Sequence, residues 1–420
     1  MHRLLLNRAF ARFWLAGLFF LVASWALHAT MLIYVFQLTG SAFATGLIPV
    51  FSALPIIVLG PIAGVLVDRW NRRLVMSRCS IILAGLLLLA IPFASNIGAP
   101  ALFTIILVQA MLMTFFSPAE NALLPTLVDQ DDLAAANSRN ALNDSLARIG
   151  GPAIGAWVLV QFGFASTLAV CAVLYLLGWT VLAGLQHDDQ NERRLATPRA
   201  IGFGPMMHSF GRELMVGVHA VRRYRPILIA VIVFALFMVA DVALSAVLPA
   251  FMIDSVGVTP QVFGTLMSVR GLTGLLGGLV VVVLSRRVHE ERLLVAGLLV
   301  HGASVLTFGL SNNLIGSILI LVPIGPAAAA IQTGLFTMLQ KGSVPAMRGR
   351  VFALVGMVNG LITILVSLGG GSLGEAVGTR IVVIMSGCLY IIPIAVMVAW
   401  LRSKPEANQR IGPEPGSAAT

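Results

Sequence analysis

A few ionisable residues stand deep inside long apolar stretches of this 420-residue sequence. Asp241 and Arg270 lie on consecutive stretches, each about 10 residues from the same end, so both would lie about 15 Å below one surface if the stretches are helices. Either charge alone is unfavourable there, and each offsets the other. A carboxylate beside a cation stays ionised until that cation is displaced. The spacing therefore indicates reversible protonation of Asp241, with a purely structural pair as the alternative.

Glu120 and Arg148 form a second candidate pair. Both stand near the ends of apolar stretches that point to the side carrying the basic loops. We expect an ion pair that locks one conformation, and we prefer this to a direct role in contacting a ligand. The remaining deep polar residues are His28, His301 and Asn359, for which hydrogen-bonded structural roles stay open.

The composition identifies an integral membrane protein. Hydrophobic residues make up 58% of the chain and charged residues 10%, whereas a soluble domain has about 25% charged residues. The net charge of +10 comes from basic residues that flank apolar stretches, which indicates membrane orientation and not nucleic-acid binding. Cys79, Cys171 and Cys388 all lie inside apolar stretches and predict no disulfide framework.

The sequence lacks the motifs that are typical of several classes of enzyme and cofactor-binding protein. It contains no Gly-Lys-Ser or Gly-Lys-Thr for binding ATP. The stretch His289–Arg292 lacks the second histidine of a zinc protease, and the seven histidines are scattered. We therefore expect no cofactor and no metal ion, and a membrane enzyme is a weak alternative.

Apolar runs of about 20 residues, the length of a membrane-spanning helix, predict an all-α membrane protein. Twelve such runs are present: 11–38, 43–67, 74–94, 100–124, 141–163, 166–186, 226–252, 261–284, 292–310, 313–339, 350–372 and 380–401. Of 27 Lys and Arg residues, only Arg270 and Arg380 fall outside the segments that face one side. Because basic loops stay in the cytoplasm, we expect both termini there.

The stretch Gly60–Arg73 ends one of these runs with an acid and three arginines. It resembles the signature loop between the second and third spans of the major facilitator superfamily. The matching residues are Gly64, Asp68, Arg69, Arg72 and Arg73. Asn71 replaces a family glycine and is expected to keep its left-handed backbone, while Gly60 and Gly64 should let neighbouring helices approach. A plain stop signal that sets topology is the alternative.

The resemblance implies a fold of twelve transmembrane helices in two six-helix bundles. We assign residues 1–186 to the N-terminal bundle, 187–225 to a cytoplasmic linker, 226–402 to the C-terminal bundle and 403–420 to a disordered cytoplasmic tail. Apolar residues at helical spacing between Met207 and Val221 predict an amphipathic helix in the linker, lying on the inner leaflet.

The two halves repeat, and the repeat locates further candidates. Asp68 corresponds to Ser285, 217 positions later, so the acid of the signature occurs in the first half only. We expect Asp68 to meet Arg348 or Arg350 across the halves and so form a cytoplasmic gate.

His28 and Asp241 are 213 positions apart, an offset shared by other matching stretches. They therefore occupy matching places in spans 1 and 7, which the resemblance puts beside the central cavity. Both are candidates for that cavity.

Gly151, Pro152 and Gly155 resemble the antiporter motif of facilitator drug exporters, except that Ala156 replaces its last glycine. Glycines let helices touch and proline bends a helix, so a packing kink is the alternative reading. The stretches 117–125 and 344–352 look like the branch that contains macrolide efflux pumps and siderophore exporters. Residues 100–116 lack the arginine that many proton-coupled drug exporters carry in the fourth span, so proton coupling cannot be inferred from that motif.

These features predict a secondary active transporter that exports amphipathic drugs or related small molecules in exchange for protons. Two bundles would rock about a cavity at the midplane. The expected partners are a small-molecule substrate, protons and the lipid bilayer, with no nucleic acid, for a monomer in the cell membrane. Export of a specific metabolite such as a siderophore, movement of a lipid, and a transport-dead sensor or scaffold are the alternatives.

Overall fold

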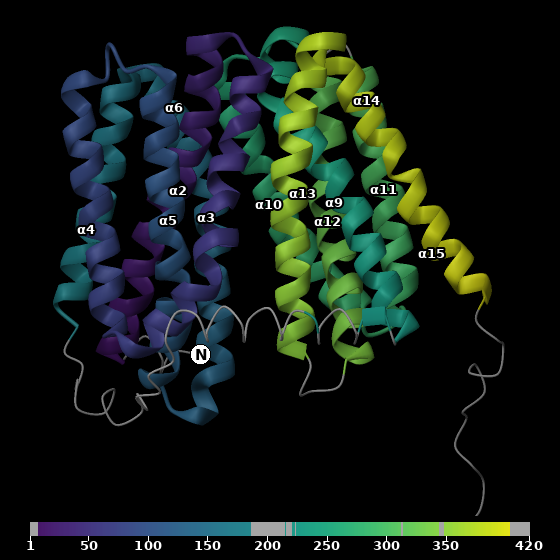
Figure 1. The fold of residues 1–420 in the computed structure, drawn as a ribbon, viewed down its shortest axis with the longest axis horizontal. Helices are drawn as coiled ribbons and strands as arrows, with labels where there is room; N and C mark the ends of the chain where they lie inside the picture. The colour runs from purple at the N-terminus through teal and green to yellow at the C-terminus, as the bar shows by residue number, and fades with distance from the viewer. Residues whose placement is uncertain are drawn as a thin grey trace, which may run out of the picture.

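The computed structural model describes residues 7–185, 215, 221–222, 224–311, 314–343 and 348–403. Every element in this part of the chain is a helix, which confirms the predicted all-α class. The helices run side by side in two groups, α2 to α6 and α9 to α15 (Figure 1). The predicted linker helix and tail fall almost entirely outside the described residues.

The first group begins with α2 (Arg8–Thr39) and α3 (Ala42–Arg69), which are joined by a tight turn at Gly40 with a φ of 61°. The chain continues through α4 (Arg72–Ala90), η1 (Ile91–Phe93), α5 (Ala99–Leu123), η2 (Leu124–Thr126), η3 (Gln130–Asp132) and α6 (Leu133–Ala183).

Helix α6 contains two of the predicted spans. Its 51 residues would extend about 77 Å as one straight helix, more than twice the roughly 30 Å of a hydrocarbon core. Gly163 interrupts it with φ 82° and ψ 176°, a conformation that glycine tolerates. Within the described residues, 11 helices are long and apolar enough to cross a membrane, and the break at Gly163 reconciles them with the twelve predicted runs.

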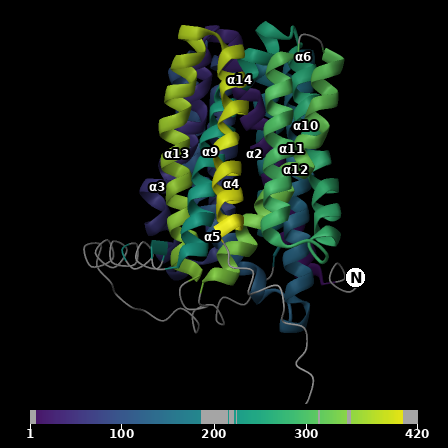
Figure 2. The same cartoon turned by 90° about the vertical axis from the view of Figure 1, so that its right-hand side faces the viewer.

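The second group begins with α9 (Arg225–Ala250) and the π-helical turn η4 (Phe251–Ser255). The helices that follow are α10 (Pro260–Leu284), α11 (Glu290–Leu310), α12 (Leu314–Gly342), α13 (Arg348–Val377), α14 (Thr379–Leu389) and α15 (Ile391–Ser403). Helices α14 and α15 continue one another through Tyr390, so they form one span (Figure 2).

Two pairs of helices make the most extensive contacts between the groups, and α3 also packs on α9. Helix α3 packs on α13, and α6 packs on α10, in both cases through small residues. A Cβ atom on Gly46 would lie 2.9 Å from the backbone oxygen of Ser367. One on Gly264 would lie 2.2 Å from the Cβ atom of Ala156. Larger side chains at these glycines would push the two groups apart.

These contacts lie toward one end of the molecule. We call it the Gly163 end, because the turn at Gly163 is there, and we call the opposite end the Asn71 end. At the Gly163 end, the Glu375 carboxylate of α13 accepts hydrogen bonds from the Ser41 hydroxyl and from the backbone N–H of Phe43 at 3.2 Å. The groups are therefore tied together at the Gly163 end.

The signature loop near the Asn71 end departs from two expectations. A Cβ atom on Gly60 or Gly64 would have no described atom within 4 Å, so the expected close approach of backbones there is wrong. The reason is that the contacts joining the two groups lie toward the other end. Asn71 has φ −66° and ψ 111°, so the expected left-handed backbone is wrong too. Its side chain instead caps α4 by accepting a hydrogen bond from the backbone N–H of Leu74 at 2.9 Å.

Candidate functional site

The deep ionisable residues of the second group meet in one place. Asp241 of α9 lies between Arg270 of α10 and His301 of α11. The Arg270 Nη2 atom is 3.7 Å, and the His301 Nε2 atom 3.6 Å, from Asp241 Oδ1. The contact that equal depth predicted for Asp241 and Arg270 is therefore present. We call these three residues, together with Tyr390, the Asp241 cluster.

The Asp241 cluster has a closed side and an open side. His301 is fully buried, and its ring stacks on Tyr390 with centroids 5.1 Å apart. Phe237 meets both rings edge-on. The side chains of Arg270 and Asp241 are 27% and 22% exposed. An aromatic wall thus covers one side of the carboxylate, while the other side is open.

The polar atoms of this cluster are incompletely paired. Neither ring nitrogen of His301 has a hydrogen-bond partner within the described residues, and the same holds for the Tyr390 hydroxyl and Asp241 Oδ1. Separations of 3.6 and 3.7 Å exceed normal hydrogen-bond lengths. Small movements of α9, α10 or α11 would therefore decide whether Asp241 pairs with Arg270, pairs with His301 or is protonated.

Sequence reasoning recognised only part of this cluster. It noted His301 as a deep polar residue without giving it a site, and it missed Tyr390. A signal was available, because Tyr390 follows the buried Tyr175 by 215 positions, close to the offset of the repeat.

The first group has its own charged cluster, formed by Trp25 of α2 with Asp144 and Arg148 of α6, which we call the Trp25 cluster. The Arg148 Nη2 atom is 2.5 Å from Asp144 Oδ2. The guanidinium carbon of Arg148 lies 5.0 Å from the centre of the Trp25 ring. The Trp25 indole N–H donates to Asp144 Oδ1 at 3.3 Å.

The expected ion pair of Arg148 with Glu120 is wrong. Asp144 stands one helical turn before Arg148 on the same helix and pairs with it instead. Sequence reasoning missed Asp144, although its i,i+4 spacing from Arg148 was a visible signal.

Glu120 lies instead in a closed space between α5, α2 and α6, where it is 7% exposed. A Cβ atom on Gly17 would come within 3.0 Å of its Oε1 atom and within 3.4 Å of Asn143 Nδ2. Asn143 in turn donates to the backbone oxygen of Trp14 at 2.7 Å. These contacts place Glu120 in the packing of the first group.

His28 lies half-buried on α2, with its ring edge-on to Trp25 at 6.4 Å. His28 and Asp241 belong to different clusters, and no ion pair joins His28 to a carboxylate of the described chain. That His28 and Asp241 occupy matching places in the two halves stays a prediction.

The antiporter-like motif brings α6 against α2. A Cβ atom on Gly151 would lie 2.6 Å from the Cβ atom of Trp25, and one on Gly155 would lie 2.5 Å from the backbone oxygen of Ala26. On the neighbouring face of α6, the backbone oxygen of Pro152 is 2.9 Å from the position of a Cβ on Gly264 of α10. The motif thus packs α6 against its own group and against the other group at once.

Two arginines of the signature loop cap other helices. Arg72 donates to the backbone oxygen of Ala122, at the end of α5, at 3.4 Å. Arg73 donates to the backbone oxygens of Leu182 and Ala183, at the end of α6, at 3.2 and 2.8 Å. Cations in these positions satisfy carbonyl groups that a helix end leaves without partners.

The predicted gate cannot be followed in the same way. The side chains of Asp68, Arg348 and Arg350 fall outside the part of the chain that the structure describes, and Arg69 ends α3. Their contact across the halves remains a prediction.

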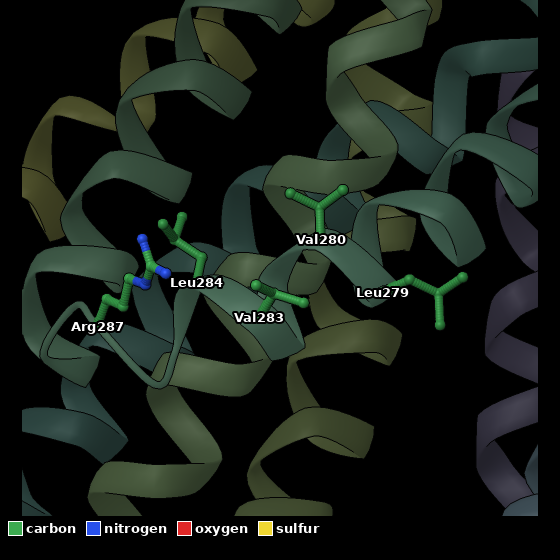
Figure 3. Close-up of a pocket in the computed structure, with 5 residues that line it drawn as sticks. All are labelled: Leu279, Val280, Val283, Leu284 and Arg287. Carbon is green, nitrogen blue, oxygen red and sulfur yellow. The ribbon is translucent and has the colours of Figure 1, made fainter.

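A shallow hollow of about 550 Å³ lies at the Asn71 end of α10 (Figure 3). It is lined by Leu279, Val280, Val283, Leu284 and Arg287. All five come from the last turns of α10 and the turn after it, so the hollow belongs to the surface of one helix and not to either charged cluster. Among the described residues, no three His, Cys, Asp or Glu side chains are arranged to hold a metal ion.

The sequence matches known membrane proteins along almost its whole length. The model of the family described as "Transmembrane secretion effector" matches residues 4–414. Macrolide efflux protein A of Streptococcus pyogenes is 25% identical over 396 residues, which cover 92% of this chain and 94% of that protein. YfiS, an MFS-type transporter of Bacillus subtilis (strain 168), is 27% identical over 383 residues, 86% of each chain.

Solved structures share the fold. The nucleoside transporter NupG superposes with a TM-score of 0.74 at 15% identity, covering 93% of this chain and 99% of that one. A bacterial homologue of the iron transporter ferroportin, in an inward-facing state, gives 0.72 at 15% identity, covering 94% and 98%. At these identities the likeness concerns the arrangement of helices.

Proposed function

Because this chain belongs to the major facilitator superfamily, within the family described as "Transmembrane secretion effector", we propose that it exports amphipathic small molecules in exchange for protons. As a family member with many apolar helices, it is a multi-pass membrane transport protein. The substrate class, the direction and the coupling to protons are the proposed parts. The name of the relative macrolide efflux protein A supports the proposed substrate class and the proposed direction.

The observation that carries the proposal is the position of Asp241. Its side chain is 22% exposed, well inside a spanning helix, and the Arg270 guanidinium stands 3.7 Å from its Oδ1 atom. A partly exposed charge at that depth is unfavourable unless it faces water or a partner, and ionisable residues in such places commonly serve transport. Asp241 can therefore be reached by a proton, and its pairing with Arg270 can change with the conformation of the helices.

The proposed cycle uses competition for this carboxylate. When Asp241 is ionised, it holds Arg270, and α9 and α10 are tied at this level. A proton on Asp241 removes the negative charge, so Arg270 is released and the helices can shift relative to one another. The groups that face Asp241 are Arg270, His301 and Tyr390, and no other ion pair to Asp241 occurs within the described residues. Loss of the proton to the other side of the membrane would restore the pair.

We also propose that both termini lie in the cytoplasm and that the Gly163 end faces outward, because Lys and Arg concentrate in the segments of the Asn71 end. On a cysteine-free background, Ser311→Cys should react with an impermeant thiol reagent added outside intact cells. Ser403→Cys should react only after permeabilisation. The opposite labelling pattern would overturn this orientation.

The export proposal is tested by uptake into everted membrane vesicles carrying the wild-type chain. A proton gradient should drive accumulation of a macrolide or a lipophilic dye into these vesicles. Asp241→Asn should abolish the accumulation while leaving gradient-independent exchange of the compound measurable, because only the coupling step needs the carboxyl group.

Asp254→Asn is the matched control. Asp254 lies on the same span, in η4, and is exposed away from the cluster. This variant should pump as the wild type does. Normal pumping by Asp241→Asn would show that Asp241 is structural, and absence of gradient-driven accumulation by the wild type would refute export in exchange for protons.

A further inference from the structure

The Trp25 cluster is a charged site at the boundary between the two groups of helices. Asp144, Arg148 and Gly151 follow one another at helical spacing on the face of α6 that meets α2. On its other side, the backbone oxygen of Arg148 is 3.1 Å from the position of a Cβ on Gly271 of α10. The cluster thus sits where α2, α6 and the opposing helix α10 come together.

The side chains of this cluster are open although they lie within spanning helices. Arg148 is 50% exposed and Asp144 is 44% exposed. Half-exposed charges would be strongly unfavourable against hydrocarbon, so this exposure is most easily explained by water between the two groups. Toward the Asn71 end, a Cβ atom on Gly60 or Gly64 of α3 would meet no described atom within 4 Å, which agrees with a space that widens in that direction.

The contacts made by Arg148 are those that an organic cation needs. Its guanidinium lies over the Trp25 ring at 5.0 Å, within the distance at which a cation is attracted to an aromatic face. It also touches the Asp144 carboxylate. The indole N–H of Trp25 holds the same carboxylate from the other oxygen, so the ring and the charge are fixed relative to one another.

We propose that the Trp25 cluster is a binding subsite for a lipophilic organic cation, and that Arg148 occupies this subsite as a tethered substitute when the cation is absent. The inference rests on the proposed function and adds the charge of the substrate to it. A bound cation takes the place of the guanidinium on Trp25 and against Asp144. The long Arg148 side chain then turns into the open space, where its charge is hydrated.

The competition predicts opposite effects for two neutralising substitutions. Without the tethered guanidinium, the ring face and the carboxylate are free, so Arg148→Gln binds a cation more tightly. Without the carboxylate, Asp144→Asn binds it more weakly. A purely structural ion pair predicts that both substitutions act through stability and change the affinities for charged and neutral ligands alike.

The test is equilibrium binding to the purified full-length protein in detergent, with two probes of similar shape. Tetraphenylphosphonium carries a positive charge, and triphenylphosphine oxide is neutral. Arg148→Gln should tighten tetraphenylphosphonium binding about threefold to fivefold, and Asp144→Asn should weaken it by a similar factor, magnitudes expected for one cation–π contact and one partly exposed charge pair. Binding of triphenylphosphine oxide should change little in either variant.

Trp25 needs gentler substitutions, because its Cβ atom packs against Gly151. Trp25→Phe keeps an aromatic face and should retain most of the cation affinity, whereas Trp25→Leu keeps bulk without a π system and should lose it. Equal changes for both probes, or no gain of tetraphenylphosphonium affinity in Arg148→Gln, would overturn the inference. Specific cation binding by a chain that fails to pump in vesicles would count against the proposed export and leave this subsite standing.

Discussion

Two buried tyrosines, Tyr175 and Tyr390, stand 215 positions apart in the two halves and have opposite surroundings. In the first half, the Tyr175 hydroxyl lies 3.0 Å from the Ser24 hydroxyl and accepts from Gln109 at 3.5 Å. In the second half, Tyr390 faces His301, and its hydroxyl has no hydrogen-bond partner in the described part of the chain. One network is neutral and paired, while the other surrounds a carboxylate and is incomplete.

The difference indicates how the halves divide their work. A paired buried network favours one arrangement of the helices that it joins, here α2, α5 and α6. The Asp241 cluster has unpaired polar atoms and contacts of 3.6 to 3.7 Å, so we expect several arrangements of α9, α10 and α11 to lie close in free energy. We therefore expect the second half to respond to protonation, and the first half to provide a fixed frame and the proposed cation subsite.

The largest expected difference between the halves concerns their arginines. Arg270→Ala leaves Asp241 without its cation inside the membrane, and we expect about 2–4 kcal/mol of lost stability and no transport. Arg148→Ala disrupts a pair that is about half exposed, so the loss of stability should stay below about 1 kcal/mol. Thermal unfolding in detergent measures both. Similar losses at the two sites would contradict the contrast between the clusters.

A smaller effect is expected at the signature loop, whose acid occurs in one half only. Asp68→Asn should reduce transport several-fold while the protein stays in the membrane, and cysteines facing the space between the halves should react faster from the cytoplasm. Ser285→Ala, at the matching place in the second half, should leave transport unchanged, because within the described residues the Ser285 hydroxyl donates to the backbone oxygen of Val282 in its own helix turn and to no other group. Wild-type transport and accessibility in Asp68→Asn would refute the gate.

The smallest expected effect is a difference in stability between substitutions at Tyr175 and at Tyr390. Tyr175→Phe removes the partner of Ser24 and Gln109 and should destabilise the protein by about 1 kcal/mol. Tyr390→Phe removes a hydroxyl that makes no hydrogen bond to a described residue, so its stability should be unchanged or slightly higher. Matched unfolding curves decide the point, and a larger loss for Tyr390→Phe would reverse the proposed division between the halves.

Positions along the helices were predictable from the sequence, because apolar length and charge fix depth in a membrane. The contact of Asp241 with Arg270 followed from equal depth on consecutive spans, and the break at Gly163 fell on the last residue of the predicted run 141–163. Depth does not fix rotation about the helix axis. Glu120 and Arg148 were therefore paired wrongly, and Asp144, one turn away, was overlooked.

Contacts between distant spans were the least predictable part. His301 and Tyr390 come from α11 and from the junction of α14 and α15, and nothing in a single sequence places their rings in contact. The sequence also allowed two conformations at Asn71. The family glycine at this position suggested a left-handed turn, whereas the structure shows a helix cap. The same residue type favours both conformations.

The central claim is that Asp241 carries the exchanged proton, and proton release on substrate binding tests it most directly. Tetraphenylphosphonium is added to the purified protein in weakly buffered detergent solution with a pH-sensitive dye. If substrate binding displaces a proton from Asp241, the wild type and Asp254→Asn should both acidify the solution, while Asp241→Asn should bind the cation without releasing a proton. Equal release by Asp241→Asn and the wild type would contradict the account.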